Sequence, residues 1–311
     1  MALHIRVLGA AAGGGFPQWN ANNEACRRAR LGENAARPAT QASLAVSTDG
    51  RHWVLLNASP DLRQQILANS QLHPQSGLRD SPIRAVILTN GDVDAIAGLL
   101  CLRERQPIAL YATGLVLSIL AENPIFAVLA PQSVERRRLM LEEPMKLRSR
   151  DGMPLGLVLE AFSVPGKVPL YLESGEETSI ETACLGEETI GIKLSDLKGR
   201  SFFFIPSCAA MTAELADRLA GARLVFFDGT LWRDDEMIRE GSGTKTGRRM
   251  GHMSASGPDG AIAAFSSLGV ERKIFIHINN SNPLLLADSQ ERAEAAAFGW
   301  EVAEDGMGVI L

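Results

Sequence analysis

Short apolar runs separated by polar, glycine-rich segments recur along the 311 residues of the chain. Continuous apolar runs predict strands buried on both faces at residues 85–88, 202–205, 224–227 and 274–276. Residues 43–47 and 53–57 flank an Asp-Gly pair and predict a β-hairpin. Helices are expected at 61–67, with Ser59 as the N-cap, and at 95–103. This alternation of strands and helices favours an α/β architecture.

Each predicted buried strand is followed by polar residues. These include Asp92 and Asp94 after the first, Cys208 after the second, Asp228 after the third and His277 after the fourth. Ligands of α/β sheets bind outside the carboxyl ends of strands, so we expect the functional site there. The region 134–187 is more irregular, and we expect it to contain an excursion over that site.

Composition narrows the class of protein. The chain has 31 basic and 36 acidic residues, a net charge of −5, which argues against a nucleic-acid partner bound through a global positive field. No apolar run approaches the roughly 20 residues needed to span a bilayer. The cysteines are widely spaced, without a CxxC pair, and fit a reducing cytoplasm: Cys26, Cys101, Cys184 and Cys208. We therefore expect a cytoplasmic protein with no membrane span.

Asp92 and Asp94 lie two residues apart on a loop that follows a buried strand. Paired carboxylates in this position suit a hard or borderline cation. The alternative is helix N-capping, because an Asp before a helix accepts a backbone N–H and favours the positive end of the helix dipole. Taken alone, the pattern favours capping.

His252 and His277 are candidate ligands or acid/base groups, His277 because it comes directly after an apolar strand. The alternative for each is a hydrogen-bonded core histidine. Asp228 follows a third predicted strand. Its presence makes the functional and the core-histidine interpretations about equally favoured.

Two further segments could contact a substrate. The glycine-rich, basic loop 241–249 carries Lys245, Arg248 and Arg249, which suit carboxylates or phosphates, although a solvated loop fits equally well. Three glycines followed by an aromatic-rich stretch bring Trp19 into a segment that either walls a pocket or forms a tight loop.

Taken together, these segments closely resemble the pyrroloquinoline quinone (PQQ) biosynthesis protein B family, over essentially the whole chain. The resemblance is carried by residues 7–9, 11–20, 56–65, 88–94, 163–170, 227–230, 243–247, 249–253 and 276–280. Strings this long, in this order, do not arise by chance.

The resemblance implies a metallo-β-lactamase-like fold, an αββα sandwich of two mixed sheets flanked by helices, over residues 1–311 as one domain. The superfamily signature HxHxDH falls on residues 90–95. Its first two histidines become Asn90 and Asp92, its aspartate is Asp94, and its last histidine is Ala95, which cannot bind metal. His277 matches the C-terminal ligand histidine of the superfamily. His252 resembles an active-site histidine of its tRNA-processing branch.

A second departure concerns a structural zinc. The family typically carries a CxCxxC cluster after the tryptophan, and only Cys26 of that cluster remains here. A lone thiol does not make a closed zinc site, so we expect this zinc to be absent or weakly bound.

The family is regarded as an iron-dependent hydroxylase of the tyrosine in a Glu–Tyr-derived PQQ precursor. This implies Fe(II), with zinc as the alternative metal, held by Asp92, Asp94, His277 and His252. His252 and Asp228 are then the expected catalytic residues. Lys245, Arg248, Arg249 and Trp19 are expected to bind the small-molecule or dipeptide precursor. Other PQQ-pathway proteins are expected partners, and a homodimer is left open.

Two other functions stay open. The family has also been described as moving PQQ or its precursor toward the periplasm, and binding and delivery would tolerate the loss of ligand residues. A metal-dependent hydrolase, common in the superfamily, ranks last because Asn90 and Asp92 replace two zinc-binding histidines.

Overall fold

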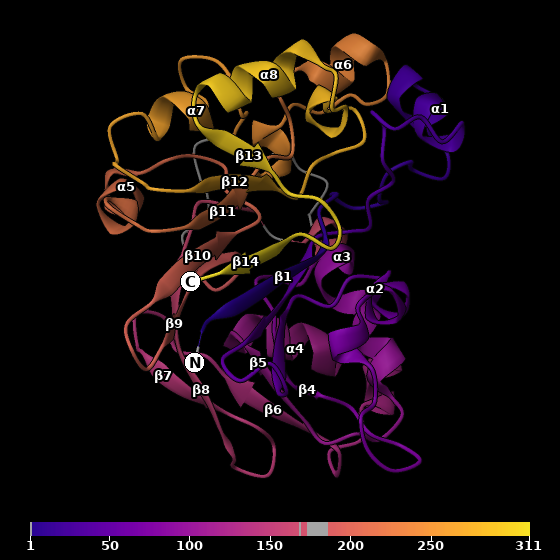
Figure 1. Cartoon of the computed structure of the whole chain (residues 1–311), viewed down its shortest axis with the longest axis vertical. Helices are drawn as coiled ribbons and strands as arrows, with labels where there is room; N and C mark the ends of the chain where they lie inside the picture. The colour runs from indigo at the N-terminus through magenta and orange to yellow at the C-terminus, as the bar shows by residue number, and fades with distance from the viewer. Residues whose placement is uncertain (1, 168, 173–185) are drawn as a thin grey trace.

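The computed structural model describes residues 2–167, 169–172 and 186–311, so Val168 and Cys184 lie outside the described residues. Within these ranges the chain forms two sheets of seven strands each (Figure 1). The first sheet has the order β14-β1-β2-β3-β4-β5-β6, and the second has the order β13-β12-β11-β10-β9-β8-β7. The chain therefore builds most of one sheet before the other and returns to the first with its last strand.

The strands of the first sheet are β1 (His4–Gly9), β2 (Ser43–Ser47), β3 (Trp53–Leu56), β4 (Ile83–Ile87), β5 (Ile108–Ala112), β6 (Val134–Arg138) and β14 (Gly308–Ile310). Those of the second are β7 (Met145–Arg148), β8 (Pro154–Ser163), β9 (Ile190–Asp196), β10 (Ser201–Ile205), β11 (Val225–Asp228), β12 (Lys273–Ile276) and β13 (Trp300–Val302). The α-helices are α1 (Glu24–Arg30), α2 (Leu62–Ala68), α3 (Val93–Ile96), α4 (Gly114–Glu122), α5 (Ala213–Leu219), α6 (Glu236–Glu240), α7 (Ala261–Ala264) and α8 (Gln290–Ala297).

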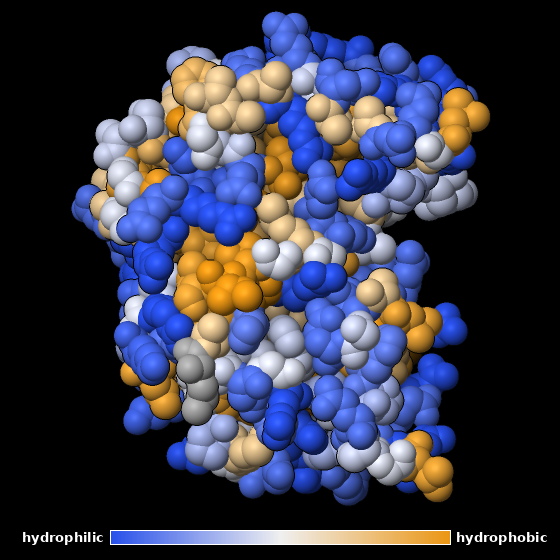
Figure 2. All heavy atoms as spheres, viewed as in Figure 1, coloured by the Kyte–Doolittle hydropathy of each residue, from blue (hydrophilic) through white to orange (hydrophobic). Residues whose placement is uncertain are grey.

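Three apolar clusters define the layers. One lies between the sheets and joins side chains of both, such as Val46 and Phe204. A second packs α5, α7 and α8 against the second sheet, and a third packs α2, α3 and α4 against the first. Figure 1 shows these helices on the two outer faces. In Figure 2 an apolar area is visible on this face between the sheets, surrounded by polar side chains. The predicted αββα sandwich is confirmed.

The four predicted buried strands are confirmed as β4, β10, β11 and β12, and the predicted hairpin as the antiparallel pair β2–β3. β3 to β6 run parallel in the first sheet, and β10 to β13 run parallel in the second. Parallel strands end at the same edge, so the polar residues that follow them gather at one edge of each sheet.

Local predictions were less accurate. Helix α2 begins after Asp61, and the Ser59 hydroxyl is buried without a partner, so the predicted Ser59 cap is wrong. The helix expected at 95–103 is α3 followed by a 3-10 helix, η2 (Ala97–Leu102). A Cβ at Gly98 would lie 2.0 Å from the Ser59 carbonyl oxygen, so this segment packs too closely for any other residue. Residues 134–163, expected to be irregular, hold β6, β7 and the ten-residue β8.

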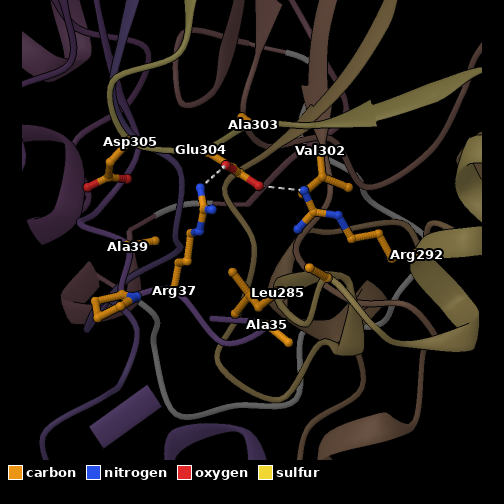
Figure 3. Close-up of a pocket in the computed structure, with 11 residues that line it drawn as sticks. Ala35, Arg37, Ala39, Leu285, Arg292, Val302, Ala303, Glu304 and Asp305 are labelled. Atoms are coloured by element: carbon orange, nitrogen blue, oxygen red, sulfur yellow. Dashed lines mark hydrogen bonds and ion pairs between the residues drawn. The ribbon is translucent and has the colours of Figure 1, made fainter. Parts of the chain in front are cut away.

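The first and last parts of the chain are joined by polar contacts. Asp305 accepts hydrogen bonds from the backbone N–H of Ala10 and of Thr40, at 3.1 and 2.8 Å. Beside it, Glu304 pairs with Arg37 and Arg292 across a small hollow (Figure 3). These contacts fix the direction in which the glycine-rich segment leaves β1. No helix in the described ranges has the length and apolar content needed to cross a bilayer.

Candidate metal centre

The loop after β4 is held rigidly by buried hydrogen bonds. The side chain of Asn57 accepts from the Thr89 backbone N–H and donates to the Thr89 hydroxyl, both at 2.9 Å. Asn90 then accepts from the Asp92 backbone N–H at 3.1 Å. Asp92 occupies the N-cap position of α3, but its side chain makes no capping hydrogen bond. The capping interpretation is therefore not what the structure shows for Asp92.

Asp94, in the first turn of α3, reaches across to the other sheet. Its Oδ2 lies 2.8 Å from His277 Nε2. Burial alone would raise the pKa of Asp94, but the hydrogen bond and positive charge of His277 outweigh burial and hold that pKa below its ordinary value. The same pair raises the pKa of His277 against the opposing effect of burial. The two groups form a buried, charge-assisted pair.

The two histidines come from the second sheet. His277 follows β12 with a φ of 61°, a left-handed conformation that few non-glycine residues adopt and that often marks functional sites. His252 follows the 3-10 helix η5 (Arg248–Met250) and the left-handed Gly251. The two rings stack with centroids 5.2 Å apart. Both imidazoles are hydrogen-bonded, yet both also line an open cavity, so neither is a simple core histidine.

Asp228 ends β11 and is fully buried. Its Oδ2 lies 2.7 Å from His252 Nδ1 and accepts from the Cys208 backbone N–H at 2.8 Å. Its Oδ1 accepts from the Thr230 backbone N–H at 3.0 Å and from the Thr230 hydroxyl at 2.6 Å. The Asp-Gly-Thr segment at the end of β11 thus forms a turn. Within it, the Asp228 carboxylate contacts both Thr230 of its own loop and the His252 imidazole.

Among the described residues, the candidate metal-binding group is Asp228, His252 and His277, whose donor atoms all lie within 4.8 Å of one another. Asp94 adds a carboxylate oxygen through its contact with His277. Mixed carboxylate and imidazole donors suit Fe(II) and zinc, so the residues present fit a metal ion. Ala95 is buried in the apolar cluster under the first sheet and offers no donor.

The site opens into a cavity of about 730 Å³ between the ends of the two sheets. Its described lining is Ala12, Gly13, Gly14, Gln41, Asn90, Asp92, Val93, Asp94, Lys167, Tyr171, Ser207, Thr230, Met237, Lys245, Met250, His252, His277 and Asn279. The lining includes the carboxylates of Asp92 and Asp94 and the ammonium groups of Lys167 and Lys245. A molecule that carries both an aromatic ring and carboxylates would find complementary groups here.

The predicted site residues divide into two sets. Asp92, Asp94, His252, His277 and Lys245 meet in the cavity, with Asp228 directly behind. Three predicted substrate-binding residues are not part of the described lining. The Trp19 side chain is 86% exposed, Arg248 pairs with Asp259 at 3.5 Å, and Arg249 follows it on η5. The basic loop turns only its lysine inward.

Sequence reasoning missed several lining residues, notably Lys167, Gln41, Asn279 and Tyr171. Lys167 comes from the Pro-Gly-Lys turn after β8, in the stretch that was expected to be irregular. Tyr171 donates from its hydroxyl to the Gly91 carbonyl at 2.6 Å and so joins that stretch to the Asp92 loop. The strand-end rule could have identified Asn279, but not residues that arrive from outside the strand ends.

The surroundings of Cys26 do not fit a zinc ion. Its backbone N–H donates to Asn23 Oδ1 at 2.8 Å, and its sulfur lies 3.9 Å from Asn280 Oδ1. Asn280 also donates to Gln18 at 2.5 Å, so amides surround the thiol. Burial raises the pKa of this thiol, which reduces the thiolate form that metals bind. Absence of the structural zinc stays a prediction.

Comparison with known proteins agrees with this geometry. Residues 52–278 match the family model described as a beta-lactamase superfamily domain. Coenzyme PQQ synthesis protein B from Gluconacetobacter diazotrophicus is 59% identical over 309 residues, 99% of each chain. The crystal structure of Zn(2+)-bound PqqB from Methylobacterium extorquens has a TM-score of 0.93 at 50% identity and covers 99% of this chain and 100% of that one.

A new diphosphatase from the PhnP family is more distant, at 19% identity and a TM-score of 0.69, over 100% of this chain and 98% of that one. That likeness concerns the fold alone. The full-length identities to the two PQQ synthesis proteins are stronger evidence for family membership. On this evidence the chain belongs to the coenzyme PQQ synthesis protein B family, within the beta-lactamase superfamily.

Proposed function

We propose that this chain acts in PQQ synthesis as an Fe(II)-dependent hydroxylase of the tyrosine ring in a Glu–Tyr-derived precursor. The observation that carries the proposal is the meeting of Asp94, His277 and His252 at the base of a cavity of about 730 Å³. Carboxylate and imidazole ligands with open positions suit non-haem Fe(II) and oxygen chemistry. The two relatives that are 50% or more identical to this chain are PQQ synthesis proteins, and one was crystallised with Zn2+.

The metal would be held by Asp94, His277 and His252, and Asp92 lines the same cavity. When bound, Fe(II) would supply the activation of dioxygen that an aromatic hydroxylation requires. The protein would contribute the positions of the metal ligands. The buried loops after β4 and β12 hold the ligands before metal arrives, so little ordering is left to be done on binding.

The remaining cavity residues would orient the precursor. Lys167 and Lys245 suit its carboxylates, because an ammonium bound to a carboxylate makes a strong charge-assisted hydrogen bond. Gln41 and Asn279 offer amide donors and acceptors in the same cavity. Asp92, which lines the cavity and is not one of the three proposed metal ligands, would take up the proton that the ring loses.

The test uses the full chain reconstituted with Fe(II) under anaerobic conditions and then mixed with a peptide-derived Glu–Tyr precursor, oxygen and an excess of a two-electron reductant such as ascorbate. The reductant supplies the electrons that convert the second oxygen atom to water. Oxygen consumption matched by a product one oxygen atom heavier supports the proposal. His277→Ala should abolish both signals, and His52→Ala, in the β2–β3 hairpin, should leave them unchanged. Tight Fe(II) binding without precursor-dependent oxygen uptake would refute the hydroxylase.

Binding and delivery of PQQ or its precursor is the second candidate. Ala95 favours it, because a family ligand position has lost its imidazole and a carrier needs no complete metal shell. Calorimetry of the metal-free chain with PQQ separates the two functions. Binding that is equally tight with and without metal supports delivery, whereas binding that requires the metal supports the enzyme.

A further inference from the structure

The hydroxyl of Thr230 lies between Asp228 and the two histidines, and the proposed function assigns it no role. Its Oγ1 lies 2.6 Å from Asp228 Oδ1, 2.8 Å from His277 Nδ1, 2.9 Å from the His277 carbonyl oxygen and 3.0 Å from His252 Nδ1. Four polar atoms therefore compete for a group that is only 5% exposed. One hydroxyl has a single proton and two lone pairs, which limits how it can bond.

The shortest of these contacts determines which atom accepts the hydrogen of the Thr230 hydroxyl. Asp228 Oδ1 is a carboxylate oxygen that can only accept, and 2.6 Å is typical of a hydroxyl donating to a carboxylate. With its proton on Asp228, the Thr230 oxygen presents lone pairs to the imidazoles. His277 Nδ1 must then carry a hydrogen and donate it to Thr230. His277 Nε2 is thereby directed toward the cavity side, where in the metal-free chain its hydrogen is donated to Asp94 Oδ2 at 2.8 Å.

Asp228 itself is saturated. Its two oxygens receive hydrogen bonds from the Thr230 N–H, the Thr230 hydroxyl, the Cys208 N–H and the His252 ring. A carboxylate has about four lone-pair positions, so all are used. The residue is fully buried and is not among the described residues that line the cavity. Asp228 therefore anchors the imidazoles from behind. It orients His252 directly, whereas within the described part of the chain no hydrogen bond joins it to His277.

We propose that Thr230 is the positioning residue that extends the orienting effect of Asp228 to His277. One buried carboxylate thus directs two imidazoles: His252 through Oδ2, and His277 through Oδ1 and the Thr230 hydroxyl. Both rings are held with Nδ1 protonated and Nε2 toward the cavity. Such partners behind a ligand fix its tautomer and ring orientation. The inference rests on the metal site of the proposed function and is independent of the hydroxylation.

The experiment follows the protonation of ring nitrogens by long-range 1H–15N NMR in the metal-free chain labelled at histidine. We expect wild-type His277 and His252 to carry a hydrogen on Nδ1. In Thr230→Val, which keeps the side-chain shape, His277 Nδ1 loses its acceptor and its hydrogen, and only the Nε2 hydrogen that faces Asp94 should remain. Thr230→Ser should restore the wild-type pattern.

Zn2+ affinity gives the second readout. Thr230→Val should weaken Zn2+ binding by about 10- to 100-fold, the range for loss of a partner behind a metal ligand, and Thr230→Ser should return it to within about threefold. Thr113→Val is the matched control, because it removes a buried hydroxyl at the start of α4 that bonds the Glu187 carbonyl and neither histidine. It should change neither the His277 signals nor the Zn2+ affinity.

Several results would overturn the inference. One is a wild-type spectrum in which His277 Nδ1 lacks its hydrogen, which decides the matter even if Thr230→Val does not fold. Another is a folded Thr230→Val chain that keeps the Nδ1 hydrogen and binds Zn2+ as wild type does. If the spectra and affinities respond as expected while the Fe(II)-loaded chain consumes no oxygen, the role of Thr230 stands and the hydroxylase falls.

Discussion

The two sheets bring unlike groups to the same cavity. The first contributes oxygen donors, with Asp92 and Asp94 on a loop that faces the cavity directly. The second contributes imidazoles, backed by Asp228, which is fully buried and is not among the described residues that line the cavity. Both sheets thus place aspartates at strand ends, yet those of the first line the cavity, whereas Asp228 accepts hydrogen bonds from its own loop, the Cys208 N–H and His252. Position in the fold, rather than residue type, separates the proposed ligand from the proposed anchor.

The largest effect tests the imidazole side. His277→Ala removes a ring that bonds both Asp94 and Thr230. We expect Zn2+ or Fe(II) affinity to fall by at least about 100-fold, beyond the range for partners that only support a ligand. Calorimetric titration measures it, with His52→Ala as a control. Affinity retained within about threefold would mean that the metal binds elsewhere.

The carboxylate side is tested at Ala95, where the superfamily signature has histidine. Ala95 is 3% exposed in the apolar cluster under the first sheet. We expect Ala95→His to lower the free energy of unfolding of the metal-free chain by about 1–3 kcal/mol through overpacking. Metal affinity should change little, because Asp94 and the two imidazoles suffice. Urea denaturation and metal titration measure the two effects. A rise in affinity of tenfold or more would show that the site is degraded by the alanine.

A third effect concerns a carboxylate of the second sheet's loops. Glu236 accepts from the Trp232 and Arg233 backbone N–H groups and from the Ser281 hydroxyl. Burial, against these hydrogen bonds, raises the pKa of Glu236 from 4.5 to about 7. Between these values the folded chain binds a proton more tightly than the unfolded chain, so this group's contribution to stability is lost as pH rises.

Glu236→Gln keeps the acceptor oxygen and removes the charge. We expect the variant to gain about 1–2 kcal/mol over wild type between about pH 5 and about pH 8. Urea denaturation across this pH range checks it, with the exposed Glu294→Gln as the control. A difference between variant and wild type that does not change with pH would contradict the ionisation argument.

A smaller effect separates two basic residues of one loop. Lys245 lines the cavity, and Arg248 pairs with Asp259 outside it. If the proposed precursor binds here, Lys245→Ala should raise KM by about tenfold, the loss of one charge-assisted hydrogen bond. Arg248→Ala should leave KM within about twofold of wild type. Steady-state oxygen uptake measures both, and equal effects would place the precursor outside the cavity.

The last prediction is that a substitution at Cys26 has no effect on metal content. Cys26→Ser should leave the zinc content of the purified chain unchanged, because amides rather than thiols and imidazoles surround Cys26. Metal analysis of wild type and variant measures it. Loss of one zinc per chain would show that a site forms around this thiol.

The layers and the strand ends could be predicted because they depend on short-range patterns. Buried strands such as β4 and β12 are continuous apolar runs, and the residues that follow them, Asp94 and His277, were found on that basis. Roles that depend on pairing across the fold could not be found this way. Nothing local distinguishes Asp94, the proposed ligand, from Asp228, the proposed anchor, because the difference lies in Cys208, 20 residues before Asp228, and in the neighbouring threonine hydroxyl.

Long-range contacts also explain the local failures. Ser59 has the residue type of a cap, but its hydroxyl lies buried where Gly98 packs against its backbone. Lys167 follows a strand that was not predicted, so its place in the cavity had no signal in the sequence pattern. The basic loop had the composition of an anion site, but only tertiary packing decides that Lys245 faces in and Arg248 faces out.

The pairing of β1 with β14 has a consequence for synthesis of the protein. Residues 4–6 lie opposite residues 308–310, so the outer edge of the first sheet is completed by strands from opposite ends of the chain. While the ribosome is still translating, β1 has an open edge, and open edges are templates for pairing with other chains. Contacts this distant also form slowly. We therefore expect the nascent chain to be more prone to aggregation before β14 emerges than after it pairs with β1.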